Sequence, residues 1–162
     1  MLDRIWNGCF AIVKIFAGKG LCPKNSLDEF FQAIFKGNVS EVSYHLENGR
    51  SANEEIEDGC SILFTAVEGG SCAVVQLLLD NGADVNTVDN SGFTPLHLAV
   101  ENTVDANGDN YVLAEEEELD IVLCLLKAGA DLSKISDRGD TAIDFAEEYG
   151  FEEIVSLLRS YA

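Results

Sequence analysis

The sequence repeats itself at a regular interval, and this periodicity constrains the fold more than any other feature. The segment "GCSILFTAVEGG" (59–70) aligns with "GFTPLHLAVEN" (92–102) at an offset of 33 residues. A further copy, "GDTAIDFAEEYG" (139–150), follows the second at an offset of 47. A chain that copies itself at intervals of about 20–50 residues folds as a stack of similar units, each resting on its neighbours.

Each copy continues into a second apolar segment. "VVQLLLDNGADVN" (74–86) and "IVLCLLKAGADL" (121–132) share a leucine-rich run and a Gly-Ala-Asp ending. An earlier, degenerate copy, "LDEFFQAIFKGNVSEVSYHLENGRSAN" (27–53), precedes them at the same interval, because Ala33 lies 33 residues before Ala66. Apolar runs that end at a glycine are typical of helices, so we expect a pair of helices in each copy.

One copy is longer than the others. From Ala66 to Leu77 is 11 positions, whereas the matching distance from Ala99 to Cys124 is 25. The extra 14 residues therefore lie between the two helices of the third copy, within the acidic segment 102–118.

The end of this insertion predicts an early helix start. The run Glu115–Glu118 directly precedes the second apolar segment, and acidic side chains in a first turn oppose the positive end of the helix dipole. We expect about one extra turn of helix there. Calcium binding is a weaker alternative, because the twelve-position pattern around Gly108 places Thr103 first and Ala114 last. A surface loop that the fold tolerates is the simpler interpretation.

The copies resemble the ankyrin repeat family. The resemblance rests on the T-P-L-H-x-A core at 94–99 together with the period, and it covers residues 26–162. It implies a mainly α solenoid of about four repeats, each with an inner helix, a turn, an outer helix and a β-hairpin-like finger. The expected repeats span 26–55, 56–88, 89–135 with the insertion at 102–118, and 136–162.

Several residues of the repeats have expected local roles. Thr94 is the expected cap of an inner helix and Pro95 its first residue, where a missing N–H costs nothing. The resemblance gives His97 a structural role, in hydrogen bonds to the loop backbone and to Thr94. Ser61 and Thr141 are expected to keep the cap in the copies that lack the proline. The glycines expected to end outer helices are Gly49, Gly82 and Gly129.

The N-terminal segment 1–25 is predicted to form an amphipathic helical extension, with Leu2, Ile5 and Trp6 on one face. Asp3 and Lys14 argue against a signal peptide, because they interrupt its expected charge and apolar regions. One interpretation is a cap on the exposed end of the core. The other is a helix that docks on a lipid surface or a partner through residues 1–20.

Charge is distributed unevenly along the chain. The net charge is −19, divided as +3 over residues 1–24 and −22 over residues 25–162. A field this negative repels nucleic acid and anionic lipid and attracts cationic partners. We therefore expect a protein partner with a basic surface, no nucleic acid, and a chain that is monomeric on its own.

The five cysteines match no zinc spacing. Cys72 and Cys124 fall on apolar helical faces, where a thiol acts as a small hydrophobe. Their number and placement favour a reducing, cytoplasmic setting. His97 and His45 are 52 residues apart, so a metal pair is not expected.

No combination of residues indicates catalysis. The sequence has no Ser-His-Asp arrangement, no glycine-rich phosphate loop, no H-E-x-x-H and no C-x-x-C. We expect neither an enzyme nor a cofactor or metal.

The resemblance places partner binding on the finger tips and the exposed face of the inner helices, a concave surface with apolar anchors inside an acidic rim. Aromatic anchors would supply affinity, and carboxylates would speed encounter with a basic partner. The alternative is that the apolar members pack against neighbouring repeats. The predicted binding residues are Glu57, Asp58, Cys60, Thr65, Glu68, Asn90, Ser91, Phe93, Leu98, Glu101, Asp137, Arg138, Asp140, Phe145 and Glu148.

These features favour a non-enzymatic protein-binding module. A narrower alternative is an immunity protein or antitoxin that masks a cationic toxin or nuclease, motivated by the short, acidic chain. A second alternative is a membrane-surface adaptor anchored by residues 1–20.

Overall fold

The structure, a computed structural model, describes residues 26–55, 60–103 and 116–162. The predicted N-terminal extension (1–25) and most of the predicted insertion lie outside the described residues. The described helices are α2 (Ser26–Phe35), α3 (Val39–Glu47), α4 (Ile62–Glu68), α5 (Cys72–Asp80), α6 (Pro95–Asn102), α7 (Glu116–Lys127), α8 (Ala142–Glu148) and α9 (Glu152–Ser160).

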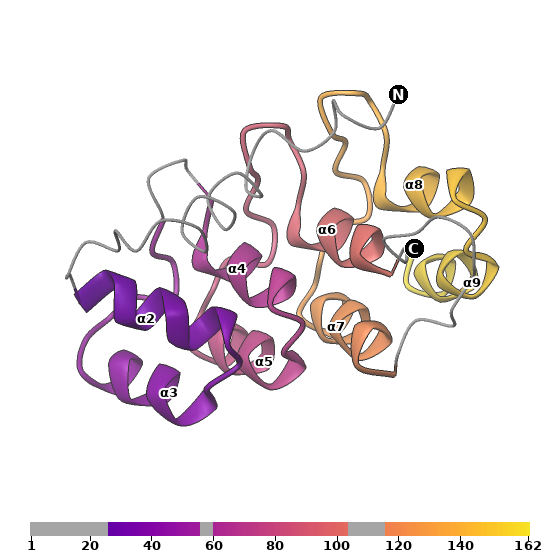
Figure 1. The fold of residues 1–162 in the computed structure, drawn as a ribbon. Coiled ribbons are helices and arrows are strands. Elements are labelled where there is room, and N and C mark those ends of the chain that lie inside the picture. Colours follow the sequence, from indigo (N-terminus) through magenta and orange to yellow (C-terminus); the bar gives the residue numbers. More distant parts are fainter. Residues whose placement is uncertain (1–25, 56–59, 104–115) are drawn as a thin grey trace, which may run out of the picture.

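The helices form two layers. An inner layer of α2, α4, α6 and α8 lies over an outer layer of α3, α5, α7 and α9, as Figure 1 shows. Each inner helix contacts the outer helix that follows it and the next inner helix, while α3 contacts α5 and α5 contacts α7. Four helix pairs therefore stack in a row, which confirms the predicted mainly α solenoid.

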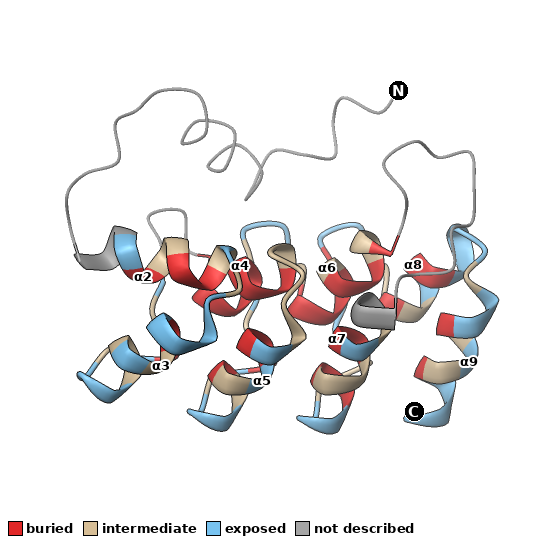
Figure 2. Ribbon diagram, turned by 60° about the horizontal axis from the view of Figure 1, so that its bottom comes forward, coloured by how far each residue is buried: buried red, intermediate tan, exposed pale blue. Residues whose placement is uncertain are grey.

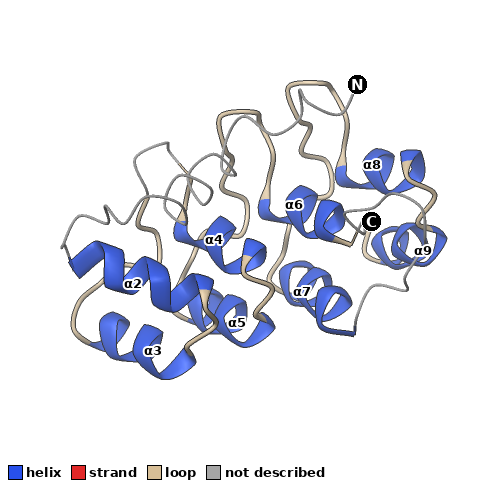
Figure 3. Cartoon of the chain, in the orientation of Figure 1, coloured by secondary structure: helices blue, strands red, loops and turns tan. Residues whose placement is uncertain are grey.

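The fingers contain very little β structure. No strand is assigned within the described ranges (Figure 3), and two isolated antiparallel bridges, Glu55 to Ser61 and Ile135 to Thr141, mark the bases of two fingers. Asparagines tie successive fingers together. Asn53 donates through Nδ2 to the Gly82 carbonyl at 2.8 Å and accepts from the Asp84 N–H at 2.7 Å.

The core lies between the two layers. Buried residues, red in Figure 2, concentrate on the inner helices and on the sides of the outer helices that face them. Every residue of α4 from Ile62 to Val67 is buried. Each inner helix has a buried alanine at the same position, which lets neighbouring helices approach closely; these are Ala33, Ala66, Ala99 and Ala146.

The helix ends follow the predicted signals with one exception. The Thr94 and Thr141 hydroxyls each accept from a backbone N–H three residues on. The expected outer-helix glycines have positive φ, at 94° for Gly49, 84° for Gly82 and 90° for Gly129. Ser61, however, makes no side-chain cap, and its buried hydroxyl has no hydrogen-bond partner. The prediction of a serine cap was wrong.

The outer helix that follows the insertion starts early, as expected. Helix α7 has 12 residues, whereas α3, α5 and α9 have nine each. The extra length comes from Glu116–Glu118, which precede Leu119. Part of the insertion therefore extends a helix, and the calcium interpretation concerns residues outside the described part.

Candidate functional site

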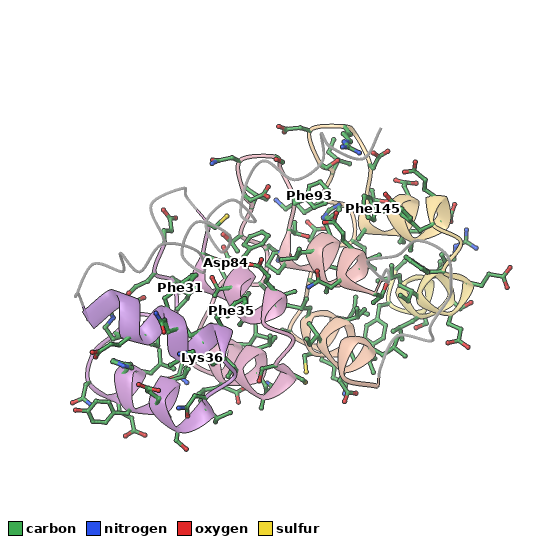
Figure 4. The ribbon with its side chains drawn as sticks, in the orientation of Figure 1. Phe31, Phe35, Lys36, Asp84, Phe93 and Phe145 are labelled. Carbon is green, nitrogen blue, oxygen red and sulfur yellow. The ribbon has the colours of Figure 1, made fainter. Side chains whose placement is uncertain are left out.

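One position of the inner helices is acidic in three successive repeats. Glu68, Glu101 and Glu148, called here the glutamate row, each lie two residues after the buried alanine of α4, α6 or α8. The same position of α2 holds Phe35, labelled in Figure 4. Because equivalent positions of parallel stacked helices share a face, the three carboxylates line one side of the inner layer. Glu101 interacts electrostatically with Asp89 and Arg138 of the fingers, so this side is the one that the fingers flank.

The row is partly removed from water. Glu68 and Glu101 are half-buried, and Glu148 is exposed. Burial raises the pKa of Glu68 to about 7. Burial also raises the pKa of Glu101, with the Arg138 guanidinium opposing and Asp89 adding to the rise. No ion pair in the described residues joins any of the three to a lysine or arginine. Desolvated, unpaired carboxylates gain strongly from a cation brought against them.

Aromatic rings lie beside the glutamate row where the third and fourth repeats meet. The Phe93 and Phe145 rings meet edge to face with centroids 5.8 Å apart (Figure 4), and Phe145 lies 4.9 Å from Tyr149. Phe145 is only 2% exposed, whereas Tyr149 is 36% exposed. Phe145 therefore supports its neighbours from inside the core, and the ring available to a partner is that of Tyr149.

The tips of adjacent fingers touch. The Asp89 carboxylate accepts from the N–H groups of Ser91 at 2.8 Å and Phe93 at 2.9 Å, which closes one finger. The Asp137 N–H donates to the Ser91 carbonyl at 2.9 Å. A Cβ on Gly92, whose φ is 71°, would lie 3.1 Å from the Asp137 nitrogen. Finger backbones thus pack directly on one another, which holds the acidic tips in register.

His97 connects a helix to the following finger. Its Nδ1 accepts from the Thr94 N–H at 3.2 Å and lies 2.8 Å from Thr94 Oγ1, while Nε2 lies 3.2 Å from the Asp140 carbonyl. The Nδ1 acceptor role leaves the proton on Nε2, which donates to Asp140. Burial lowers the pKa of His97, so the ring is neutral. The role expected from the resemblance, a structural histidine, matches these contacts.

The structure brings together some of the predicted binding residues and buries others. Glu57 and Asp58 lie outside the described residues. Cys60, Thr65 and Phe145 are each 2% exposed, so the expectation that they line the surface was wrong. Half-buried members of the predicted set are Glu68, Phe93, Leu98, Glu101 and Asp140. Exposed members are Asn90, Ser91, Asp137, Arg138 and Glu148.

Two residues were missed. Asp89 shapes the finger and adds charge near Glu101. Tyr149 offers an exposed ring next to Glu148. The repeat alignment holds a signal for Tyr149, because it occupies the position of Asn102 in the third repeat and Gly69 in the second, directly after the glutamate row.

Two other kinds of site are absent from the described ranges. No three His, Cys, Asp or Glu side chains in them are grouped so as to hold a metal ion. None of the helices described has the length and apolar character needed to cross a membrane.

Family models and relatives agree with this architecture. A model of three ankyrin repeats matches residues 30–111, and a single-repeat model matches residues 91–137. The chain belongs to the ankyrin repeat family, whose repeats are in general protein–protein interaction modules.

Three relatives illustrate the range of this similarity. A fowlpox virus (strain NVSL) protein named for its ankyrin repeats is 29% identical over 81% of this chain, which spans only 20% of that protein. Regulatory subunit 27 of mouse (Mus musculus) protein phosphatase 1 is 29% identical, with 80% of this chain and 75% of the relative covered. Human (Homo sapiens) cyclin-dependent kinase inhibitor 2A is 32% identical, with 90% and 83% covered.

Proposed function

We propose that the chain is a non-enzymatic binding module that holds a basic segment of another protein against the inner helices and fingers. The observation that carries this proposal is the glutamate row, an acidic position repeated in three stacked helices, two of whose members are half-buried. A repeated charge on a rigid solenoid presents regularly spaced carboxylates to an extended, cationic segment.

The energetics of the row favour a cationic occupant. A carboxylate that loses water without gaining a partner is destabilised, which is why the pKa of Glu68 rises to about 7. A lysine or arginine side chain placed beside it supplies the missing charge and draws the group back to its ionised form. The net charge of −22 over residues 25–162 adds long-range attraction and speeds the encounter.

The fourth repeat adds an apolar anchor. The exposed Tyr149 ring rests on Phe145, beside the carboxylate of Glu148. Aromatic residues on rigid supports are frequent centres of binding energy, and a tyrosine face also attracts cations. We expect a partner residue with a long aliphatic stem and a positive end, lysine or arginine, to lie here.

A peptide titration tests the proposal. The probe is a fluorescent lysine-rich peptide, with a glutamate-rich peptide of equal length as the negative probe, and binding is followed by anisotropy. Replacing the row with Glu68→Gln, Glu101→Gln and Glu148→Gln is expected to weaken binding of the lysine-rich peptide by at least about tenfold. Affinity for the unmodified chain is expected to fall steeply with added salt.

A matched control variant separates location from total charge. Glu47→Gln, Asp80→Asn and Glu153→Gln remove the same number of carboxyl groups from exposed residues of the outer helices α3, α5 and α9. The peptide affinity of this variant is expected to lie within about twofold of that of the unmodified chain. Charges on the outer helices act on a peptide at the inner face only at long range, where salt screens them. Equal losses of peptide affinity in the two variants would show that net charge alone determines binding. That result would contradict the proposal.

The names of two relatives bear on the mode of action. One is a regulatory subunit of a phosphatase and the other an inhibitor of kinases. By analogy, the chain is proposed to act by occupying its partner rather than by transforming it. Masking a cationic toxin or nuclease is a special case of this action, tested by whether co-expression protects cells from such a partner.

A further inference from the structure

Two thiols from neighbouring repeats are in contact on the outer layer. Cys72 is the first residue of α5, Cys124 lies within α7, and their Sγ atoms are 3.0 Å apart. Both are half-buried free cysteines, and α5 and α7 pack side by side (Figure 1). This pair lies on the layer of helices away from the glutamate row, so it is independent of the proposed binding face.

Packing alone does not account for two cysteines at this contact. The equivalent positions hold Val39 and Leu77 between the first and second repeats. Between the third and fourth repeats they hold Leu119 and Leu157. Aliphatic side chains therefore occupy these positions at both other repeat interfaces. Only the central interface has a pair of thiols, which can do chemistry that valine and leucine cannot.

We propose that Cys72 and Cys124 are a modification site that forms a reversible disulfide between the second and third repeats when the chain meets a small-molecule disulfide, such as oxidised glutathione. A sulfur–sulfur contact this short requires little backbone movement before a covalent bond forms. In a reducing compartment the two residues remain thiols and pack as small hydrophobes.

The exchange proceeds in two balanced steps. Burial and the neighbouring Cys124 raise the pKa of the Cys72 thiol to about 12, which disfavours Cys72 as the first thiolate. The Cys124 thiolate attacks one sulfur of oxidised glutathione and releases one glutathione thiolate. Cys72 then loses its proton to solvent and attacks the Cys124 sulfur of the mixed disulfide, releasing the second glutathione. The protein sulfurs are oxidised, and oxidised glutathione is reduced to two thiols.

The new bond adds a covalent link between repeats that otherwise meet through packing and through the hydrogen bonds of Asn86 and Asn102. It closes the chain between 72 and 124, which contains α6 and the insertion. Closing a long loop restricts the unfolded chain and stabilises the folded one. Because a solenoid can open between repeats, a bond across the central interface also suppresses separation of its two halves.

Peptide mapping of the full chain tests the proposal. The protein is equilibrated in a buffer of oxidised and reduced glutathione, quenched in acid, alkylated, digested without reductant and analysed by mass spectrometry. We expect the peptides that contain Cys72 and Cys124 to be recovered mainly as one linked species, which dithiothreitol separates. The midpoint of urea unfolding is expected to rise by about 1–2 M on oxidation. Cys72→Ser should abolish both effects, and Cys22→Ser should abolish neither.

The same peptide mapping can also overturn the proposal. Recovery of Cys72 and Cys124 as two alkylated thiols after equilibration would overturn it. Recovery of either as a stable mixed disulfide with glutathione, or linked to another cysteine, would do the same. Because these results come from the unmodified chain, they stand even if the Cys72→Ser variant fails to fold.

Discussion

The second and third repeats place different chemistry at the same positions of one fold. In the third repeat, Thr94 caps α6, and His97 links that cap to the next finger. In the second repeat, Ser61 stands where Thr94 would be, and Phe64 takes the place of His97. Phe64 is buried at 3% exposure, and the Ser61 hydroxyl has no partner. A repeat can thus be held either by a polar network or by apolar packing, because its neighbours supply much of its stability.

The largest loss of stability is expected when the polar network of the third repeat is replaced by the apolar side chain of the second. His97→Phe removes the ring nitrogens that contact Thr94 and the Asp140 carbonyl, so we expect a loss of about 2–4 kcal/mol in the free energy of unfolding. Urea denaturation followed by circular dichroism measures this loss. The reverse change, Phe64→His, is the control, and it should cost less because the new ring lies near the unpartnered Ser61. A larger loss from Phe64→His would contradict the comparison.

The residue at the finger base differs in the same way. Phe93 occupies the position that Cys60 has in the second repeat, and it contacts both His97 and Phe145. We expect Phe93→Ala to lower the free energy of unfolding by about 1–3 kcal/mol, because the ring is half-buried. Thermal unfolding measures the change, with Leu98→Ala as a second half-buried control. An unchanged melting temperature would show that the ring is available to a partner rather than committed to packing.

Removal of the side-chain hydroxyl is expected to have opposite effects on stability at Thr94 and at Ser61. Thr94→Ala removes a working cap and should cost about 1–2 kcal/mol. Ser61→Ala removes a buried hydroxyl that has no hydrogen bond, so it should be neutral or stabilise the fold by up to about 1 kcal/mol. Paired urea titrations of the two variants measure the difference. If Ser61→Ala costs as much as Thr94→Ala, Ser61 caps its helix in solution.

A further comparison concerns the pH dependence of stability at the glutamate row. The pKa of Glu68 is about 7 in the folded chain, against 4.5 as its ordinary value. Between these values the folded chain binds more protons than the unfolded chain, so the stability contributed by Glu68 falls as pH rises from about 4.5 to 7. Glu68→Gln should therefore raise the melting temperature by a few degrees at pH 8 and leave it nearly unchanged at pH 4.

Glu101→Gln provides the comparison for that experiment. Its pKa is also raised by burial, but Arg138 opposes the rise, so the same trend with a smaller amplitude is expected. A scanning calorimetry series over pH compares the two variants. If Glu68→Gln shifts the melting temperature equally at both pH values, burial of the Glu68 charge does not contribute to the pH dependence of stability.

Much of the fold could be predicted from the sequence, because a stack of repeats converts spacing into position. The offset of 33 residues located Ala66 and Ala99, and the Thr-Pro-Leu-His core predicted the network at His97. At Ser61 the Phe64 N–H donates to the Ser61 carbonyl at 3.0 Å and not to the hydroxyl, and the phenyl ring offers the hydroxyl no polar partner. A capping rule considers one residue, whereas the hydrogen bond requires two.

The candidate site was predictable only in part. The glutamate row follows from the alignment, but the burial that raises the pKa of Glu68 depends on packing that no spacing reveals. Phe145 was placed on the surface because its position matches Leu98, yet Phe93 and Tyr149 cover it. The thiol contact joins Cys72 to a residue that is not at its equivalent position in the next repeat, so the period alone does not pair the two.

Direct titration of the Glu68 carboxyl by NMR, with and without a saturating lysine-rich peptide, tests most directly whether the glutamate row receives a cationic partner. In the free chain the carboxyl should titrate near its pKa of about 7, and bound peptide should lower that pKa by at least about one unit as a positive charge comes against it. Backbone amide signals of the outer helix α9 should not respond to the peptide. An unchanged Glu68 pKa in the complex, with shifts confined to the outer helices, would contradict the account.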